Sequence, residues 1–268
     1  QQSKPVDPVV QTGLTETALG HTLIEHAAQI ADGWLDPALN IHLVPSWKAS
    51  DASAGSDPVK IYAISEFHAP ANYMVAVPVG CRCIFVEPHV YQSWLKDHMS
   101  TSGVKLDVDE QRLLAFMFLH EAGHIVNHDP GDFDAGGRGA LNLDPTDQKD
   151  REQKADAFAV EQLKGAMARR SKTDAWTEAQ MATMDLGNLS FEMQQVRSEK
   201  YFGSALLHTP TAYYDTGYTH PNFELRILTV NDLISNTSTS HQLLENFVEG
   251  RRSDAKPWVL YQAPSLTQ

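Results

Sequence analysis

The stretch His120-Glu121-Ala122-Gly123-His124 has the pattern HExxH. On a helix this spacing places the two imidazoles one turn apart on one face, with the carboxylate of Glu121 beside them. Two neutral imidazoles can bind one zinc ion, and the carboxylate can take a proton from a water on that ion. The stretch therefore predicts a zinc hydrolase. The alternative is an amphipathic helix whose histidines only form hydrogen bonds, and the residues downstream argue against it.

The neighbouring residues predict the helix that this motif needs. Residues 111–128 contain no proline and carry apolar side chains at helical spacing. Asp107 and Glu110 have the spacing of a capping box, in which two side chains satisfy free N–H groups at the start of a helix. We therefore expect the motif to lie on a helix that starts near these two residues.

Periodicity along the rest of the chain predicts an α+β fold that is mainly helical. A helix and four β-rich segments precede the motif, at 15–35, 41–44, 60–65, 73–78 and 81–87. A long loop and four helices follow it, at 129–147, 150–169, 174–200, 221–235 and 240–250. We expect a zincin-like fold in which the small sheet forms the upper wall of a cleft over the HExxH helix.

Length and charge limit the class of protein. We expect a single domain over residues 1–268, with a flexible lead-in at 1–10 and a C-terminal tail at 251–268. No apolar run approaches the roughly 18 residues of a membrane span. The net charge of −13 argues against nucleic acid and anionic membranes as partners. Because the chain begins at Gln1 without a leader, we expect a soluble protein, periplasmic or secreted rather than cytoplasmic.

The chain has two cysteines, Cys81 and Cys83. In a strand they would lie on one face two residues apart, which is a poor geometry for a disulfide. We therefore expect two buried structural thiols, with a C-x-C metal site as the alternative.

A catalytic zinc takes three protein ligands and keeps one position open, so the two histidines need a third partner. His128 lies about 12 Å along a straight helix from His120, too far to share one ion, and should support the site or cap the helix instead. Glu152 opens the next predicted helix, and Asp156 falls one turn later on the same face. Such a pair can be a solvated acidic face. Behind an HExxH motif it is typical of a zinc ligand and of a carboxylate that orients a ligand histidine.

Three blocks in order resemble the M48 family of zinc metallopeptidases, the gluzincins that include HtpX-like enzymes and the CAAX prenyl protease. They are HEAGHIVNHD at 120–129, EQKADAFA at 152–159 and THPNFELRIL at 219–228. With a looser match at 71–78, similar to the family's strand before the active-site helix, the resemblance covers about residues 72–228. It implies that His120, His124 and Glu152 bind one zinc ion, that Glu121 is the general base, that Asp156 orients a ligand histidine and that His220 lies near the open side of the metal.

The resemblance leaves several points open. On the residues alone, a histidine before a proline, as at His220, is more often a local structural feature, and Tyr213, Tyr214 and Tyr218 are alternative donors to the oxyanion. The transmembrane helices of many relatives have no counterpart in this sequence, so their prenylated or membrane substrates do not carry over.

Together these features predict a zinc endopeptidase that cleaves a protein or peptide substrate with a zinc-bound water activated by Glu121. The segment 72–77 should pair as an edge strand with extended substrate, through Tyr73, Met74, Val75 and Ala76; an interior core strand is the alternative. An ImmA-like regulatory protease and a zinc-stabilised binding or scaffold protein are the rival functions. The sequence does not specify the substrate, the cleavage preference, a pro-segment or the oligomeric state.

Overall fold

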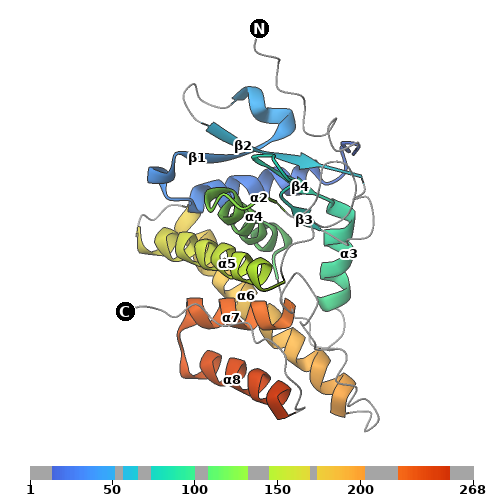
Figure 1. The fold of residues 1–268 in the computed structure, drawn as a ribbon, viewed down its shortest axis with the longest axis vertical. Helices are drawn as coiled ribbons and strands as arrows, with labels where there is room; N and C mark the ends of the chain where they lie inside the picture. Colours follow the sequence, from blue (N-terminus) through green and yellow to red (C-terminus); the bar gives the residue numbers. More distant parts are fainter. Residues whose placement is uncertain are drawn as a thin grey trace.

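The computed structural model describes residues 14–51, 57–65, 74–99, 108–131, 145–169, 174–202 and 223–253. Its helices are α2 (His21–Trp34), α3 (Pro88–Met99), α4 (Glu110–Val126), α5 (Pro145–Ala168), α6 (Asp174–Phe202), α7 (Phe223–Ser235) and α8 (Ser238–Ser253), with the short 3-10 helices η1 (Pro37–Leu39) and η2 (Ser46–Asp51). Its strands are β1 (Ile41–Pro45), β2 (Asp57–Ala63), β3 (Val75–Ala76) and β4 (Cys83–Val86). Figure 1 shows the sheet beside α2 and α4, with α7 and α8 at the opposite end of the molecule. The expected α+β class is confirmed.

The four strands form one mixed sheet in the order β1-β2-β4-β3. β1, β2 and β4 are parallel, and β3 is antiparallel to β4. Successive side chains of a strand point to opposite faces of the sheet. Ile61 and Ile84 on one face join the large core formed with α2 and α4, whereas Tyr62 and Phe85 on the other face join a smaller cluster. Each of the four predicted β segments overlaps one of these strands.

The N-terminal cap of α4 differs from the expected capping box, and the helix ends two residues earlier than expected. Asp109 is the N-cap, and its carboxylate accepts from the N–H groups of Gln111 and Arg112 at 2.9 and 3.0 Å. Asp107 lies outside the described residues. The helix ends at Val126, and His128 follows in the left-handed conformation with φ 59°. The predicted helix is therefore correct in place, but its cap is a single Asx residue.

Close packing joins α4 to α5. Ala155 and Ala159 are fully buried, as expected for small residues that let two helices approach. Gly123, inside the HExxH motif, makes the approach closer still, because a Cβ on it would lie 2.9 Å from the Cα of Ala155. The backbones of α4 and α5 are thus in close contact at the HExxH motif.

Other helices also differ from those that the periodicity predicts. α2 begins at His21 rather than at residue 15, because Glu16 forms an isolated bridge with Ile64 and Gly20 turns the chain at φ 72°. The helix α3 was not expected. α5 begins at Pro145, inside the predicted loop, and proline at a first helical turn loses no hydrogen bond.

The expectation of free thiols at Cys81 and Cys83 is wrong, because the two residues form a disulfide. Cys81 belongs to a turn rather than to a strand: its N–H donates to the carbonyl of Pro78 at 3.1 Å, after Gly80 at φ 71°. The chain bends at Arg82, between the two cysteines, and their Cα atoms are 5.2 Å apart, whereas positions i and i+2 of an extended strand are about 6.6 Å apart. The pairing also removes the alternative of a C-x-C metal site.

No helix in the described ranges is long and apolar enough to cross a membrane. The single-domain organisation and the exported location stay predictions. The lead-in at 1–10 lies outside the described residues, and α8 continues through the first three residues of the expected tail, 251–268.

Candidate metal centre

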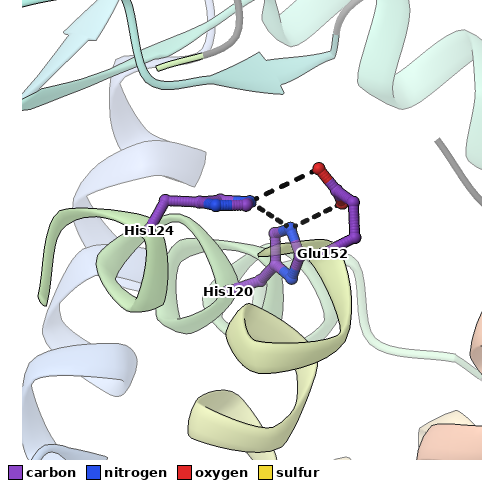
Figure 2. Close-up of side chains that lie close together, drawn as sticks. All are labelled: His120, His124 and Glu152. Atoms are coloured by element: carbon purple, nitrogen blue, oxygen red, sulfur yellow. Dashed lines mark hydrogen bonds and ion pairs between the residues drawn. The ribbon is translucent and has the colours of Figure 1, made fainter. Parts of the chain in front are cut away.

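His120 and His124 of α4 face Glu152 of α5 in a buried cluster, shown in Figure 2. The Nε2 atoms of the two histidines are 3.1 Å apart. Oε2 of Glu152 lies 3.3 Å from Nε2 of His120, and its Oε1 lies 3.5 Å from Nε2 of His124. The three side chains predicted as metal ligands are therefore brought together by two helices.

These separations fit one tetrahedral ion. Nitrogen and oxygen ligands at 2.0–2.2 Å from a tetrahedral zinc lie about 3.3–3.5 Å from one another. The observed separations of 3.1, 3.3 and 3.5 Å, the last two measured to different oxygens of Glu152, are close to those edges. Because the described part of the chain offers donors from three residues, such an ion would keep a fourth position for a water or a substrate. The group fits zinc in donor type, spacing and number.

Burial and the helix dipole favour a cation at this position. The exposed fractions of His120, His124 and Glu152 are 7%, 2% and 1%, so water screens the cluster weakly. His124 lies in the last turn of α4, where the unpaired carbonyl groups carry partial negative charge. The buried carboxylate of Glu152 already has one positive partner in Arg226, and a bound metal ion would supply a second beside this helix end.

Asp156 holds the ring of His120 from the side away from Glu152. Its Oδ1 lies 2.8 Å from Nδ1 of His120. Burial and the nearby Arg226 lower the pKa of His120, but Asp156 and Glu152 outweigh both and raise it to about 10. Burial raises the pKa of Asp156, but Arg226 and His120 outweigh it and hold that pKa below its usual range. Asp156 accepts the Nδ1–H of His120, so a metal would bind at Nε2 in place of the proton on that nitrogen.

Asp129 holds the ring of His124 in the same way. Its Oδ2 lies 2.8 Å from Nδ1 of His124. The backbone turn after α4 explains this contact: the N–H of His128 donates to the carbonyl of Ile125 at 3.3 Å, and the N–H of Asp129 donates to that of His124 at 2.9 Å. These two bonds form a Schellman motif, which returns the chain toward the helix. His128 is therefore an exposed capping residue, and Asp129 is the supporting residue that the sequence argument missed.

Arg226 of α7 links both acidic residues of α5. Its Nε and Nη2 donate to the two carboxylate oxygens of Asp156 at 3.0 and 2.8 Å, and its Nη1 lies 3.0 Å from Oε2 of Glu152. Nη2 is 3.1 Å from both ring nitrogens of His120, equal distances that place it over the ring. The guanidinium neutralises buried negative charge and ties the third sequence block to the site. The block contained this residue, but its partners could not be read from spacing.

The remaining predicted residues differ in how far the structure describes them. Glu121, the expected general base, is buried on α4 with 5% exposure. His220, the three alternative tyrosines and Tyr73 lie outside the described residues. Met74 and the strand β3 lie within them. The roles of all of these residues stay proposals.

β3 lies at one end of the strand order, where it pairs with β4. The N–H of Glu87 donates to the carbonyl of Met74 at 2.9 Å, so the backbone hydrogen-bonding groups of Met74 point toward β4. Because backbone direction alternates along an antiparallel pair, Val75 directs its N–H and C=O away from β4. The side chains of Val75 and Ala76 are buried, at 7% and 0% exposure. The segment thus has the backbone pairing of an edge strand, as in the first prediction, and the buried side chains of a core strand, as in the alternative.

Comparison with known families adds one finding. The model of a family described as Peptidase U49 matches residues 111–246, slightly more than half of the chain. The match begins in α4, includes the whole cluster and ends within α8. It is a peptidase family, but it is not M48. The comparison therefore supports the expected peptidase class and does not support the M48 family that the three blocks resemble. No curated protein and no solved structure matches the chain.

Proposed function

This chain belongs to the peptidase U49 family, and we propose that it is a zinc-dependent endopeptidase. The observation that carries the proposal is the arrangement of His120, His124 and Glu152, whose facing nitrogen and carboxylate oxygen atoms lie 3.1–3.5 Å apart, close to the edge length of a zinc tetrahedron. The peptidase family supports peptide hydrolysis with a protein or peptide as the substrate, and the cluster supports the metal.

The residues around the cluster have separate tasks in this proposal. His120, His124 and Glu152 would hold the zinc, while Asp156 and Asp129 fix the two imidazole rings. When bound, the zinc would polarise the scissile carbonyl and acidify water. Glu121 would accept a proton from the attacking water and deliver it to the leaving amine. The buried position of Glu121 on the same turn as the ligands supports this role.

The edge strand supports a place for the substrate. Val75 directs its backbone donor and acceptor to the outer edge of β3, where an extended peptide can add as a further strand. Backbone pairing of this kind holds a peptide in register and makes few demands on its side chains. We propose that Tyr73, Met74 and Ala76 flank this contact. A bound peptidic inhibitor without main-chain hydrogen bonds to residues 73–77 would rule it out.

His220 is the proposed donor to the oxyanion, with the three nearby tyrosines as alternatives. The proposal rests on the third sequence block, whose Arg226 reaches the cluster six residues later. His220→Ala should lower kcat and kcat/KM by similar factors, of order 10–1000, with unchanged zinc content. Loss of zinc would make His220 a ligand instead.

The test combines metal analysis with peptide cleavage. After removal of metal and reconstitution, the protein should contain one zinc per chain and should cleave members of a proteome-derived peptide library, and a chelator should stop cleavage. Glu121→Gln should retain zinc and lose at least about 100-fold in activity. His26→Ala, an exposed histidine on α2, is the matched control and should change neither measurement.

The outcomes separate the rival functions. Less than about half an equivalent of zinc after reconstitution would reject the metal centre. A full equivalent of zinc without cleavage of any peptide would indicate a zinc-stabilised binding protein. Near-normal turnover in Glu121→Gln would remove Glu121 from the mechanism.

A further inference from the structure

A disulfide joins the last residue of the turn between β3 and β4 to the first residue of β4. Cys81 lies just before β4, and Cys83 is its first residue. Cys83 is 2% exposed and packs within the smaller cluster of the sheet, whereas Cys81 is half-buried at the edge of that cluster. Cys81 is therefore the partner that an external thiol can reach.

The bond encloses a very short loop, with one residue between the two cysteines. The chain entropy that a disulfide removes from the unfolded state grows with the length of the loop that it closes. A loop this short adds little to the stability of the whole fold. Its main effect is local, on the path of the turn that leads from β3 into β4.

The turn that precedes the disulfide adjoins two segments that matter for the candidate centre. Its first residues continue directly from β3, whose Val75 faces the proposed substrate edge. Its backbone also packs on Gly131: a Cβ on that glycine would lie 2.7 Å from both the carbonyl carbon of Pro78 and the nitrogen of Val79. Gly131 follows Asp129, which holds the ring of His124. The position of this turn therefore bears on both the substrate strand and a support of the metal ligand.

We propose that Cys81–Cys83 is a reversible redox site whose oxidised form holds β3 in position for the substrate. The inference rests on the proposed peptidase function. The reductant is a dithiol: one of its thiolates attacks Sγ of Cys81, the bond to Cys83 breaks, and the Cys83 thiolate takes a proton. The second thiol then displaces Cys81, so the pair gains two electrons and two protons while the reductant becomes a disulfide.

Reduction releases the turn without removing a metal ligand. The strand β3 then pairs with β4 through only two residue pairs, Val75 with Val86 and Ala76 with Phe85. A two-residue strand has few bonds to keep it in place. We expect the peptide KM to rise about threefold or more, with kcat, zinc content and melting temperature little changed.

The experiment compares the full chain, loaded with zinc, in its oxidised and reduced states. Glutathione disulfide sets the first state and a trialkylphosphine the second, since dithiols would also bind the zinc. Alkylation and mass measurement count the free thiols. Each state is then assayed for peptide KM and for hydrogen exchange of the amides of residues 74–87. Faster exchange there after reduction, with α5 and α6 unchanged, is the expected result.

Cys81→Ser provides the matched control, because it removes the bond and leaves the buried Cys83 in place. It should behave like the reduced protein in both states and should not respond to the phosphine. Two free thiols that persist in the oxidant would overturn the proposal, as would equal exchange at 74–87 in the two states, or equal KM values where peptides are cleaved. If neither state cleaves any peptide, the peptidase function fails, and the exchange measurement still decides whether the redox site controls β3.

Discussion

Asp129 contacts His124 twice: its carboxylate lies 2.8 Å from Nδ1 of the imidazole, and its backbone N–H donates to the carbonyl of the same residue at 2.9 Å. The backbone bond belongs to the cap that ends α4, and the side-chain contact orients a proposed metal ligand. Helix termination and ligand orientation therefore depend on one turn of chain.

Asp129→Ala should weaken zinc binding by about 10–100-fold, the usual effect of losing a carboxylate that orients a ligand histidine. The ring of His124 would lose the acceptor that holds its Nδ1 proton. Zinc affinity measured by competition with a coloured chelator tests this. Asp129→Asn is the informative companion, since its amide oxygen can still accept that proton, and it should fall between Asp129→Ala and the wild type. Equal affinities in all three proteins would show that Asp129 has only a structural role.

His128 occupies the left-handed position of the same cap, with φ 59°. Glycine is the preferred residue there, because a Cβ costs about 1 kcal/mol in this conformation. His128→Gly should therefore stabilise the metal-free protein by up to about 1 kcal/mol in urea denaturation and leave its zinc affinity unchanged. Reduced zinc affinity in this variant would mean that the exposed imidazole takes part in the site after all.

The sequence predicted those parts of the centre whose geometry is local. His120 and His124 share a face because a helix repeats every 3.6 residues, and Glu152 and Asp156 share one for the same reason. The two helix faces meet at the buried small residue Ala155. Gly123 lies inside the motif itself, and its role in helix packing was hidden by its place in the HExxH pattern.

The missed features depend on contacts that spacing does not encode. Asp129 lies beyond the last helical residue, so no helical period relates it to His124; the Schellman turn does. Arg226 is 70 residues from Asp156, and only the packing of α7 on α5 joins them. The disulfide was missed because the strand was taken to start at residue 81, whereas it starts at Cys83 and the chain bends at Arg82, which shortens the distance between the two cysteines.

Gly123→Ala should lower zinc affinity by about tenfold or more. The added Cβ would lie 2.9 Å from Cα and 3.1 Å from the carbonyl oxygen of Ala155, and backbone can move only with the whole helix α5. Glu152 would move with it, whereas ligand distances tolerate shifts of only about 0.2 Å. The same competition assay measures the loss.

Gly165→Ala is the matched control on α5, because its Cβ would meet only Nη1 of Arg169 at 3.5 Å, an ordinary contact. It should keep full zinc affinity and stabilise the protein by up to about 1 kcal/mol, as alanine does within helices. If Gly123→Ala binds zinc as well as Gly165→Ala does, the close packing of α4 on α5 does not set the position of Glu152.

Arg226 and a bound zinc ion would both compensate the negative charge of Glu152, and a variant of Arg226 tests this overlap. In the metal-free protein Arg226→Ala leaves Asp156 and Glu152 without the guanidinium that compensates their buried charge, which typically costs about 3–5 kcal/mol. A bound zinc ion would neutralise Glu152 and should restore part of this loss. Urea denaturation of the variant in chelator and in saturating zinc should therefore show a larger gain from zinc than the wild type shows. Arg226→Lys keeps the charge but cannot form the two parallel bonds to Asp156, so its loss should be intermediate. An equal zinc gain in wild type and Arg226→Ala would contradict the view that the guanidinium and the metal share the charge of Glu152.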